Sequence, residues 1–86
     1  MKFGVGMPTG MEGLINPIPF FEPRHFIEAA RRAEELGYDS VWGNDHYAPQ
    51  NYVRQKHGST PNFYEVLTVL TAAAAVTQRV QVGTAV

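Results

Sequence analysis

The sequence contains no cysteine among its 86 residues. This absence excludes disulfide cross-links, thiolate zinc sites and a cysteine nucleophile. An excess of one charge is also missing, because 7 Lys and Arg residues are balanced by 8 Asp and Glu residues, for a formal net charge of −1. A chain this close to neutral lacks the basic excess typical of nucleic-acid-binding proteins, so we expect no nucleic-acid partner.

Long hydrophobic runs are absent as well. No apolar stretch approaches the ~20 residues that a membrane-spanning helix needs. The opening Met1-Lys2-Phe3-Gly4-Val5 has one lysine and lacks the apolar segment of a signal peptide. We therefore expect a cytoplasmic protein with no membrane partner.

Charged residues are scarce for so short a chain. They make up 17% of the sequence, against about 25% in typical soluble domains, while hydrophobic residues make up 44%. A small domain has much surface for its volume and should carry more charge, not less. The composition is typical of a segment of a larger protein, and the length allows one domain at most.

Strand and helix patterns alternate along the chain. Strands are predicted at residues 2–7, 40–43 and 79–86, and Phe3, Val5 and Met7 share one face of the first. Helices are predicted at 23–36 and 61–77, with Pro23 at a first helical position and Thr60 as an N-cap. Apolar side chains at helical spacing mark the buried sides of these two helices: Phe26, Ile27, Ala30, Ala33 and Leu36 in the first, and Phe63, Val66, Leu67, Leu70, Ala73 and Ala74 in the second.

This order predicts an α/β fold, a parallel β-α-β-α-β unit with right-handed crossovers. We expect the strands to pair in sequence order, with both helices on one face of the sheet. The strand-to-helix connections, including a long loop at 47–59, are much longer than the helix-to-strand turns. Function in parallel α/β folds gathers at the edge where those connections emerge. Three segments should therefore converge: Met7-Pro8, Asn44-Asp45-His46 and Thr84-Ala85-Val86.

Two motifs favour other kinds of site, and both are weak. Gly4-Val5-Gly6 with Gly10 resembles a dinucleotide-binding loop, but no helix opens at these glycines to hold a pyrophosphate. Small residues at Gly4 and Gly6 fit better where a barrel interior or a planar ligand leaves little room. The three histidines lack metal-ligand spacing, so no metal site is expected, and His25 and His57 are interpreted as solvated.

The Asp45-His46 pair follows an apolar strand at the functional edge. A histidine can transfer a proton near neutral pH, and an adjacent carboxylate can raise its basicity or hold one tautomer. The competing interpretation is that Asp45 caps a loop and His46 fills a gap in the packing. The residues alone leave both interpretations open.

Three segments together resemble the luciferase-like flavin oxidoreductases. They are Ala33-Glu34-Glu35-Leu36-Gly37-Tyr38-Asp39-Ser40-Val41-Trp42 followed by Asp45-His46, the run from Thr77 to Val86, and the opening Met1-Lys2-Phe3-Gly4-Val5. The resemblance implies a TIM (βα)₈ barrel that uses a deazaflavin coenzyme or FMN for monooxygenation or hydride transfer on a small organic substrate. A barrel of this type needs at least ~200 residues. Residues 1–86 would then be its first three strands and two helices, with the rest of the domain absent.

The resemblance also implies roles for particular residues. His46 becomes the proton-transfer candidate and Asp45 a residue of the cofactor pocket. Cofactor contacts are expected from the other strand ends, at Gly6, Met7, Thr84, Ala85 and Val86, with a non-prolyl cis peptide at Ala85-Val86. The run from Trp42 to His46 favours deazaflavin slightly over FMN.

Two other function classes stay open. One is a non-catalytic truncated remnant or interaction module that pairs through an exposed sheet face. The other is a small nucleotide-binding α/β domain, which the missing helix after the glycines disfavours. Homo-oligomers are compatible with the leading hypothesis.

Overall fold

The computed structural model describes residues 1–10, 12–13, 16, 18–45, 51–58 and 61–85, and at positions 53 and 57 it describes the backbone only. These residues form three strands and three helices. In chain order they are β1 (Gly4–Gly6), α1 (Pro23–Glu35), β2 (Ser40–Asn44), α2 (Asn51–His57), α3 (Val66–Val76) and β3 (Gln81–Ala85). None of the helices in this described part is long and apolar enough to cross a membrane.

The three strands form one parallel sheet in the order β1-β2-β3. The register places Gly6 of β1 and Gly83 of β3 on either side of Trp42 in the central strand. Strand order and direction are as the sequence predicts. Since β2 is the middle strand, β1 and β3 are both edges of the described sheet.

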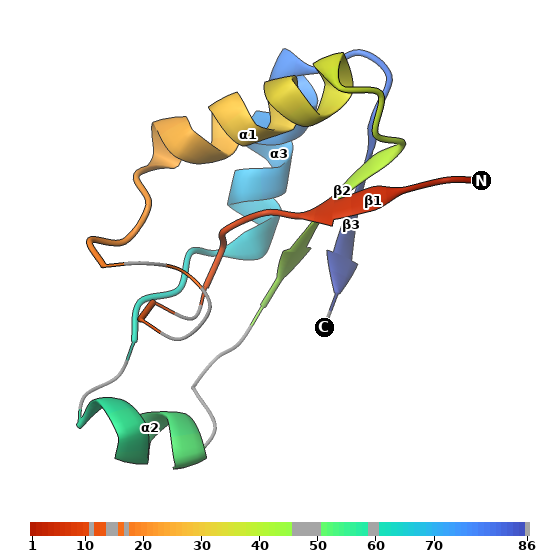
Figure 1. Cartoon of the computed structure of the whole chain (residues 1–86). Coiled ribbons are helices and arrows are strands. Elements are labelled where there is room, and N and C mark those ends of the chain that lie inside the picture. Colours follow the sequence, from red (N-terminus) through yellow and green to blue (C-terminus); the bar gives the residue numbers. More distant parts are fainter. Residues whose placement is uncertain (11, 14–15, 17, 46–50, 59–60, 86) are drawn as a thin grey trace.

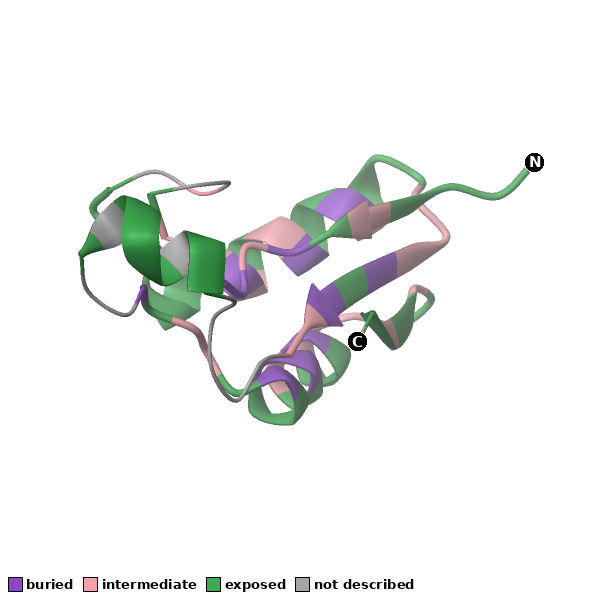
Figure 2. Ribbon diagram, turned by 90° about the horizontal axis from the view of Figure 1, so that it is seen from below, coloured by how far each residue is buried: buried purple, intermediate pink, exposed green. Residues whose placement is uncertain are grey.

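Helices α1 and α3 lie side by side on one face of the sheet (Figure 1). The buried core lies between them and β2, and Figure 2 shows its residues along the facing sides of these elements. Its members are Met7, Phe26, Ala30, Ala33, Val41, Val66, Val69, Leu70 and Ala73. The predicted placement of both helices on one face is confirmed.

The start of α3 differs from the prediction. The helix begins at Val66 and not at Pro61, because the Glu65 side chain caps it by accepting hydrogen bonds from the amides of Leu67 (3.2 Å) and Thr68 (2.7 Å). The residues before it are drawn into a different contact, since the Tyr64 amide donates to the carbonyl of Thr9 at 2.8 Å. Thr60, the predicted cap, lies outside the described residues.

The buried side of α3 also differs. Val66, Val69, Leu70 and Ala73 follow the i, i+3, i+4, i+7 spacing and are buried, so Val69 was missed. Leu67 is 64% exposed and Ala74 is exposed, contrary to prediction. Both residues line a groove between α3 and β3, to one side of the stripe that packs on the core.

Helix α2 lies within the stretch predicted to be a loop. Its seven residues contain no glycine or proline. Gly58 follows it with φ of 66°, and the Gly58 amide donates to the Arg54 carbonyl at 2.9 Å. The glycine that indicated a loop therefore terminates a short helix.

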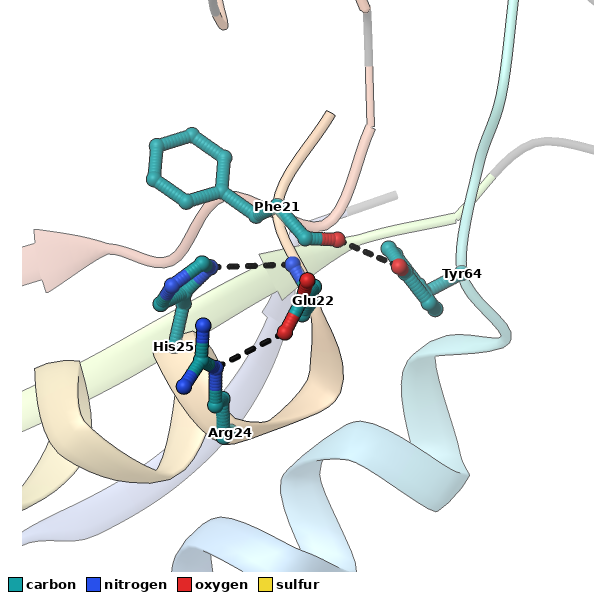
Figure 3. A network of polar contacts seen from close by, with 5 residues as sticks. All are labelled: Phe21, Glu22, Arg24, His25 and Tyr64. Carbon is teal, nitrogen blue, oxygen red and sulfur yellow. Dashed lines mark hydrogen bonds and ion pairs between the residues drawn. The ribbon is translucent and has the colours of Figure 1, made fainter. Parts of the chain in front are cut away.

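The first turn of α1 corrects the interpretation of His25 as solvated. The Glu22 amide donates to His25 Nδ1 at 2.9 Å, so the half-buried imidazole satisfies a backbone group at the helix start (Figure 3). Glu22 also pairs with Arg24 at 2.7 Å. His25 thus has a local structural task.

Glu34 joins the end of α1 to the turn before β3. Its Oε2 accepts hydrogen bonds from the amides of Gln78 (3.0 Å), Arg79 (2.7 Å) and Val80 (3.0 Å). The Arg79 guanidinium in turn donates to the carbonyls of Glu34 and Tyr38, both at 3.0 Å. The amide hydrogen bonds, from Val80 and Arg79 foremost, lower the pKa of the Glu34 carboxyl.

We expect this carboxylate to make stability depend on pH. Because folding lowers the pKa of Glu34, its contribution is present at neutral pH and is lost as the pH falls below about 4.5 and through the folded-state pKa. Glu34→Gln should therefore lower the thermal midpoint at pH 7, and the gap to wild type should narrow on acidification. Thermal unfolding of the natural protein that carries this chain, with and without the substitution, measures this gap from pH 7 to pH 3. Glu35→Gln, which removes a carboxylate paired with Arg32, controls for net charge, and a gap that stays constant with pH contradicts the prediction.

Candidate functional site

A cleft of about 650 Å³ opens at the carboxyl ends of the strands. Each strand contributes to its lining: Gly6 with the following Met7 and Pro8 from β1, Asn44 from β2 and Ala85 from β3. Residues from the loop after β1 and from the start of α1 complete it: Gly10, Asn16, Phe21 and Ala29. Of the segments expected to converge at this edge, Met7-Pro8, Asn44 and Ala85 meet here.

The predicted site residues are distributed unevenly around this cleft. Gly6, Met7 and Ala85 line it. Asp45 directly follows β2 and is half-buried. Thr84 lines the separate groove between α3 and β3. His46, Val86 and the Ala85-Val86 peptide bond lie outside the described residues.

Trp42 and Asn44 line the cleft. Asn44 belongs to a segment expected at this edge, but neither residue was predicted to contact a ligand. Strand pleating could have identified them. Side chains alternate between the two faces of a strand, and Val41 and Gly43 are buried beneath the helices. Trp42 and Asn44 must then share the face that the helices leave uncovered.

The indole of Trp42 lies across that uncovered face. A Cβ built on Gly4 would stand 2.6 Å from Trp42 Nε1, and one built on Gly83 would stand 2.6 Å from Trp42 Cζ3. The indole Nε1 donates to Ser40 Oγ at 2.8 Å, which fixes the ring along the strand direction. The room predicted above Gly4 is therefore occupied by this side chain, whereas a Cβ on Gly6 would meet nothing within 4 Å.

Thr9 connects the loop after β1 to the end of β2. It is fully buried, and its Oγ1 donates to Asn44 Oδ1 at 2.7 Å and accepts from the Asn44 amide at 3.1 Å. Close by, the Met7 amide donates to the Trp42 carbonyl at 2.7 Å. These bonds hold the ends of β1 and β2 together at the base of the cleft.

An aromatic cluster supports the wall at the start of α1. The Tyr64 hydroxyl donates to the carbonyl of Phe21, whose side chain lies beside His25 (Figure 3). The Tyr64 ring stacks on Phe20 with centroids 5.1 Å apart and meets Phe26 edge-on at 4.6 Å. Phe21, which lines the cleft, is thereby held by the segment that precedes α3.

The chemistry of the lining favours a flat, mostly apolar ligand. Among the described residues that line the cleft none is charged, and the polar side chains are the amides of Asn16 and Asn44. Such a wall suits a planar ring with a few hydrogen-bonding edge atoms. Within the described part of the chain, no three His, Asp or Glu side chains lie close enough together to hold a metal ion.

Comparison with known proteins bears on this site. The family model described as luciferase-like monooxygenase matches residues 1–86. The chain is 46% identical over 66 residues to the F420-dependent glucose-6-phosphate dehydrogenase of Amycolatopsis mediterranei, and 42% and 39% identical over 66 residues to the proteins of the same name from Kineococcus radiotolerans and Intrasporangium calvum. No solved structure matches.

These alignments cover 77% of this chain and 18% of each relative, so the chain spans less than a fifth of the length of the curated relatives it matches. The family match covers the whole chain and agrees with the resemblance found in the sequence. The chain belongs to the luciferase-like monooxygenase family.

Proposed function

We propose that residues 1–86 form the N-terminal part of a (βα)₈ barrel oxidoreductase that uses an F420-type deazaflavin to transfer hydride to or from a small organic substrate. The observation that carries the proposal is the cleft at the carboxyl ends of three parallel strands, whose described lining residues carry no charge, in a chain whose relatives are named F420-dependent. Active sites of such barrels lie at this edge.

The barrel part of the proposal is supported by the sheet. The three consecutive parallel strands, with α1 and α3 on one face, have the arrangement from which an eight-stranded barrel is built. The opposite face, which carries Trp42, would then point to the barrel interior. Residues 1–86 would form one segment of a single domain.

The residues of the cleft fit a deazaflavin ring. Gly6 leaves open space where a side chain would stand, and Met7, Trp42 and Ala85 offer apolar surface. When bound, the cofactor supplies a two-electron hydride centre, and the chain supplies binding and orientation. In this proposal Gly6, Met7 and Ala85 contact the ring, with Asp45 and Val86 beside them at the strand ends. Thr84 lies on the helix side of β3, like Val82, and has no contact in this arrangement.

His46 is proposed to transfer the proton that accompanies hydride transfer. It follows Asp45 directly in the sequence, at the end of the central strand. Histidine is the side chain most often used for general acid–base catalysis. A carboxylate at Asp45 would favour one tautomer of the ring.

Cofactor titration of the natural protein that carries this chain tests the proposal. We expect the deazaflavin to bind more tightly than FMN, and glucose 6-phosphate is the first substrate to try because the relatives' names specify it. Preferential FMN binding would overturn the cofactor assignment. Binding of neither would overturn the function and favour the interaction module.

Gly6→Val gives a matched variant for this titration. A Cβ at Gly6 meets nothing within 4 Å, so the fold should tolerate valine, while the added side chain occupies space in the cleft. We expect the Kd for the deazaflavin to rise about tenfold or more with little change in thermal midpoint. An unchanged Kd would show that the ring binds elsewhere.

A further inference from the structure

We infer that Thr9 is a positioning residue, which holds the Asn44 side chain so that its Nδ2 hydrogens are donated to an acceptor atom on the edge of the cofactor ring. The inference rests on the proposed function, because the ligand concerned is the deazaflavin. It adds Asn44 to the residues expected to contact the ligand. It also adds Thr9, which does not touch the ligand and acts by holding Asn44.

The hydroxyl of Thr9 is committed to a single partner. Thr9 is fully buried, and a buried hydroxyl is costly unless its hydrogen-bonding capacity is used. Among the described residues Oγ1 contacts Asn44 alone. It accepts from the amide nitrogen at 3.1 Å and donates to Oδ1 at 2.7 Å, with the carbonyl oxygen as a longer alternative acceptor at 3.3 Å. The two residues are 35 positions apart in the sequence, so this contact is a product of the fold.

The surroundings of Thr9 fix its position. Its amide donates to the Met7 carbonyl at 2.8 Å, and its carbonyl accepts from the Tyr64 amide at 2.8 Å. A Cβ on Gly43 would stand 3.2 Å from Thr9 Cγ2, so the glycine makes room for the threonine methyl group. The hydroxyl is therefore held by β1, β2 and the segment before α3 together.

Asn44 is left with its donors available. A side-chain amide offers one oxygen acceptor and two N–H donors. Thr9 occupies the oxygen, and among the described residues Nδ2 has no hydrogen-bond partner. Since Asn44 lines the cleft beside Gly6 and Trp42, its donors are placed to meet a carbonyl oxygen or ring nitrogen of a bound planar ligand.

Removing the Thr9 hydroxyl tests this role. Thr9→Val keeps the shape of the side chain and removes the group that holds Asn44, so the Kd for the deazaflavin should rise about tenfold, as for loss of one buried hydrogen-bonding partner. Thr9→Ser keeps the hydroxyl and should bind near the wild-type Kd. Fluorescence titration of the natural protein measures Kd, and thermal unfolding of each variant measures stability separately.

A double-mutant cycle shows whether Thr9 acts through Asn44. Asn44→Ala should raise the Kd by a similar factor, and adding Thr9→Val to it should raise the Kd no further. Additive effects would mean that Thr9 acts by another route and would overturn the inference. A Thr9→Val protein that melts earlier yet binds at the wild-type Kd would assign Thr9 a purely structural role.

The outcomes separate this inference from the function on which it rests. Wild-type protein that binds no deazaflavin overturns both. Wild-type protein that binds it, together with Asn44→Ala at an unchanged Kd, overturns the inference alone. Asn44 is half-buried, so Asn44→Ala should fold even where Thr9→Val does not. Asn44→Ala and Thr9→Ser then still decide the test.

Discussion

Replacing His46 by alanine in the natural protein is expected to lower kcat by ~10²–10⁴-fold and to leave the Kd for the deazaflavin close to the wild-type value. The reason is that a general acid or base acts on a proton in the transition state, whereas the cleft that binds the ring is built from other residues. Steady-state turnover, followed by the absorbance of the oxidised cofactor, measures kcat. The pH profile of His46→Ala should lose the limb that reports the imidazole.

His57→Ala provides the control, because it removes the same type of side chain from α2. This variant should turn over at the wild-type rate. Wild-type turnover by His46→Ala would assign His46 to packing and leave the proton transfer to another group. A parallel loss of kcat and cofactor binding would point to a disturbed cleft and not to acid–base chemistry.

The second large effect concerns residues 1–86 expressed alone, which we expect to aggregate, oligomerise or remain molten. Ordering the backbone costs about 1–2 kcal/mol per residue, and a chain of this size offsets that cost only narrowly. The described core is thin and consists mainly of small side chains, with Phe26 and Val41 its largest fully buried apolar members. Both outer strands also present unpaired backbone groups that can pair with another chain.

The surfaces left uncovered identify where association should occur. The groove between α3 and β3 exposes apolar side chains, with Leu67 64% and Val82 40% exposed. On the open face of the sheet, Trp42 is 42% exposed, while Val41 is buried beneath the helices.

Sedimentation and thermal unfolding of the isolated chain test this expectation. Leu67→Gln with Val82→Thr makes the groove between α3 and β3 more polar and should reduce association. Leu36→Gln, at an exposed apolar residue outside this groove, should reduce it less. A monomer with one sharp, cooperative transition would show that residues 1–86 are a self-sufficient domain.

Local patterns were sufficient to predict much of the fold. The α1 stripe, the proline at its start and the minimal helix-to-strand turns are local features, and with right-handed crossovers they determine parallel order and helix placement. Leu36, predicted on the buried side of this helix, is the exception: it lies just past the end of α1 and is 59% exposed. The true start of α3 was missed. The Glu65 cap that sets it is local and was overlooked, while the hydrogen bond from the Tyr64 amide to Thr9 that draws the preceding residues away joins positions far apart in the sequence. Helix α2 was missed because Pro49 and Gly58 flank it, and both residue types favour a loop.

The candidate site divides in the same way. The edge of the sheet followed from strand direction, and Gly6, Met7 and Ala85 were named because they lie where strands end. The alternation of side chains along a strand could also have identified Trp42 and Asn44, but it was applied to β1 and not to β2. The contact of Thr9 with Asn44 has no local signal at all, since neither residue's neighbours indicate that the two meet.

The indole of Trp42 lies against a glycine on each neighbouring strand, Gly4 and Gly83, so substitutions at these three positions depend on one another. Positions 4, 42 and 83 share a fixed volume, because the ring fills the space that side chains at the two glycines would need. A lineage that replaced Trp42 by a small residue would be released to accept alanine or valine at position 83, and at position 4 once the Ser40 hydroxyl, also 2.6 Å from a Cβ there, moves aside. One that gained a side chain at either glycine would first have to lose the indole. Among relatives these positions should therefore vary together, although no two of them are neighbours in the sequence.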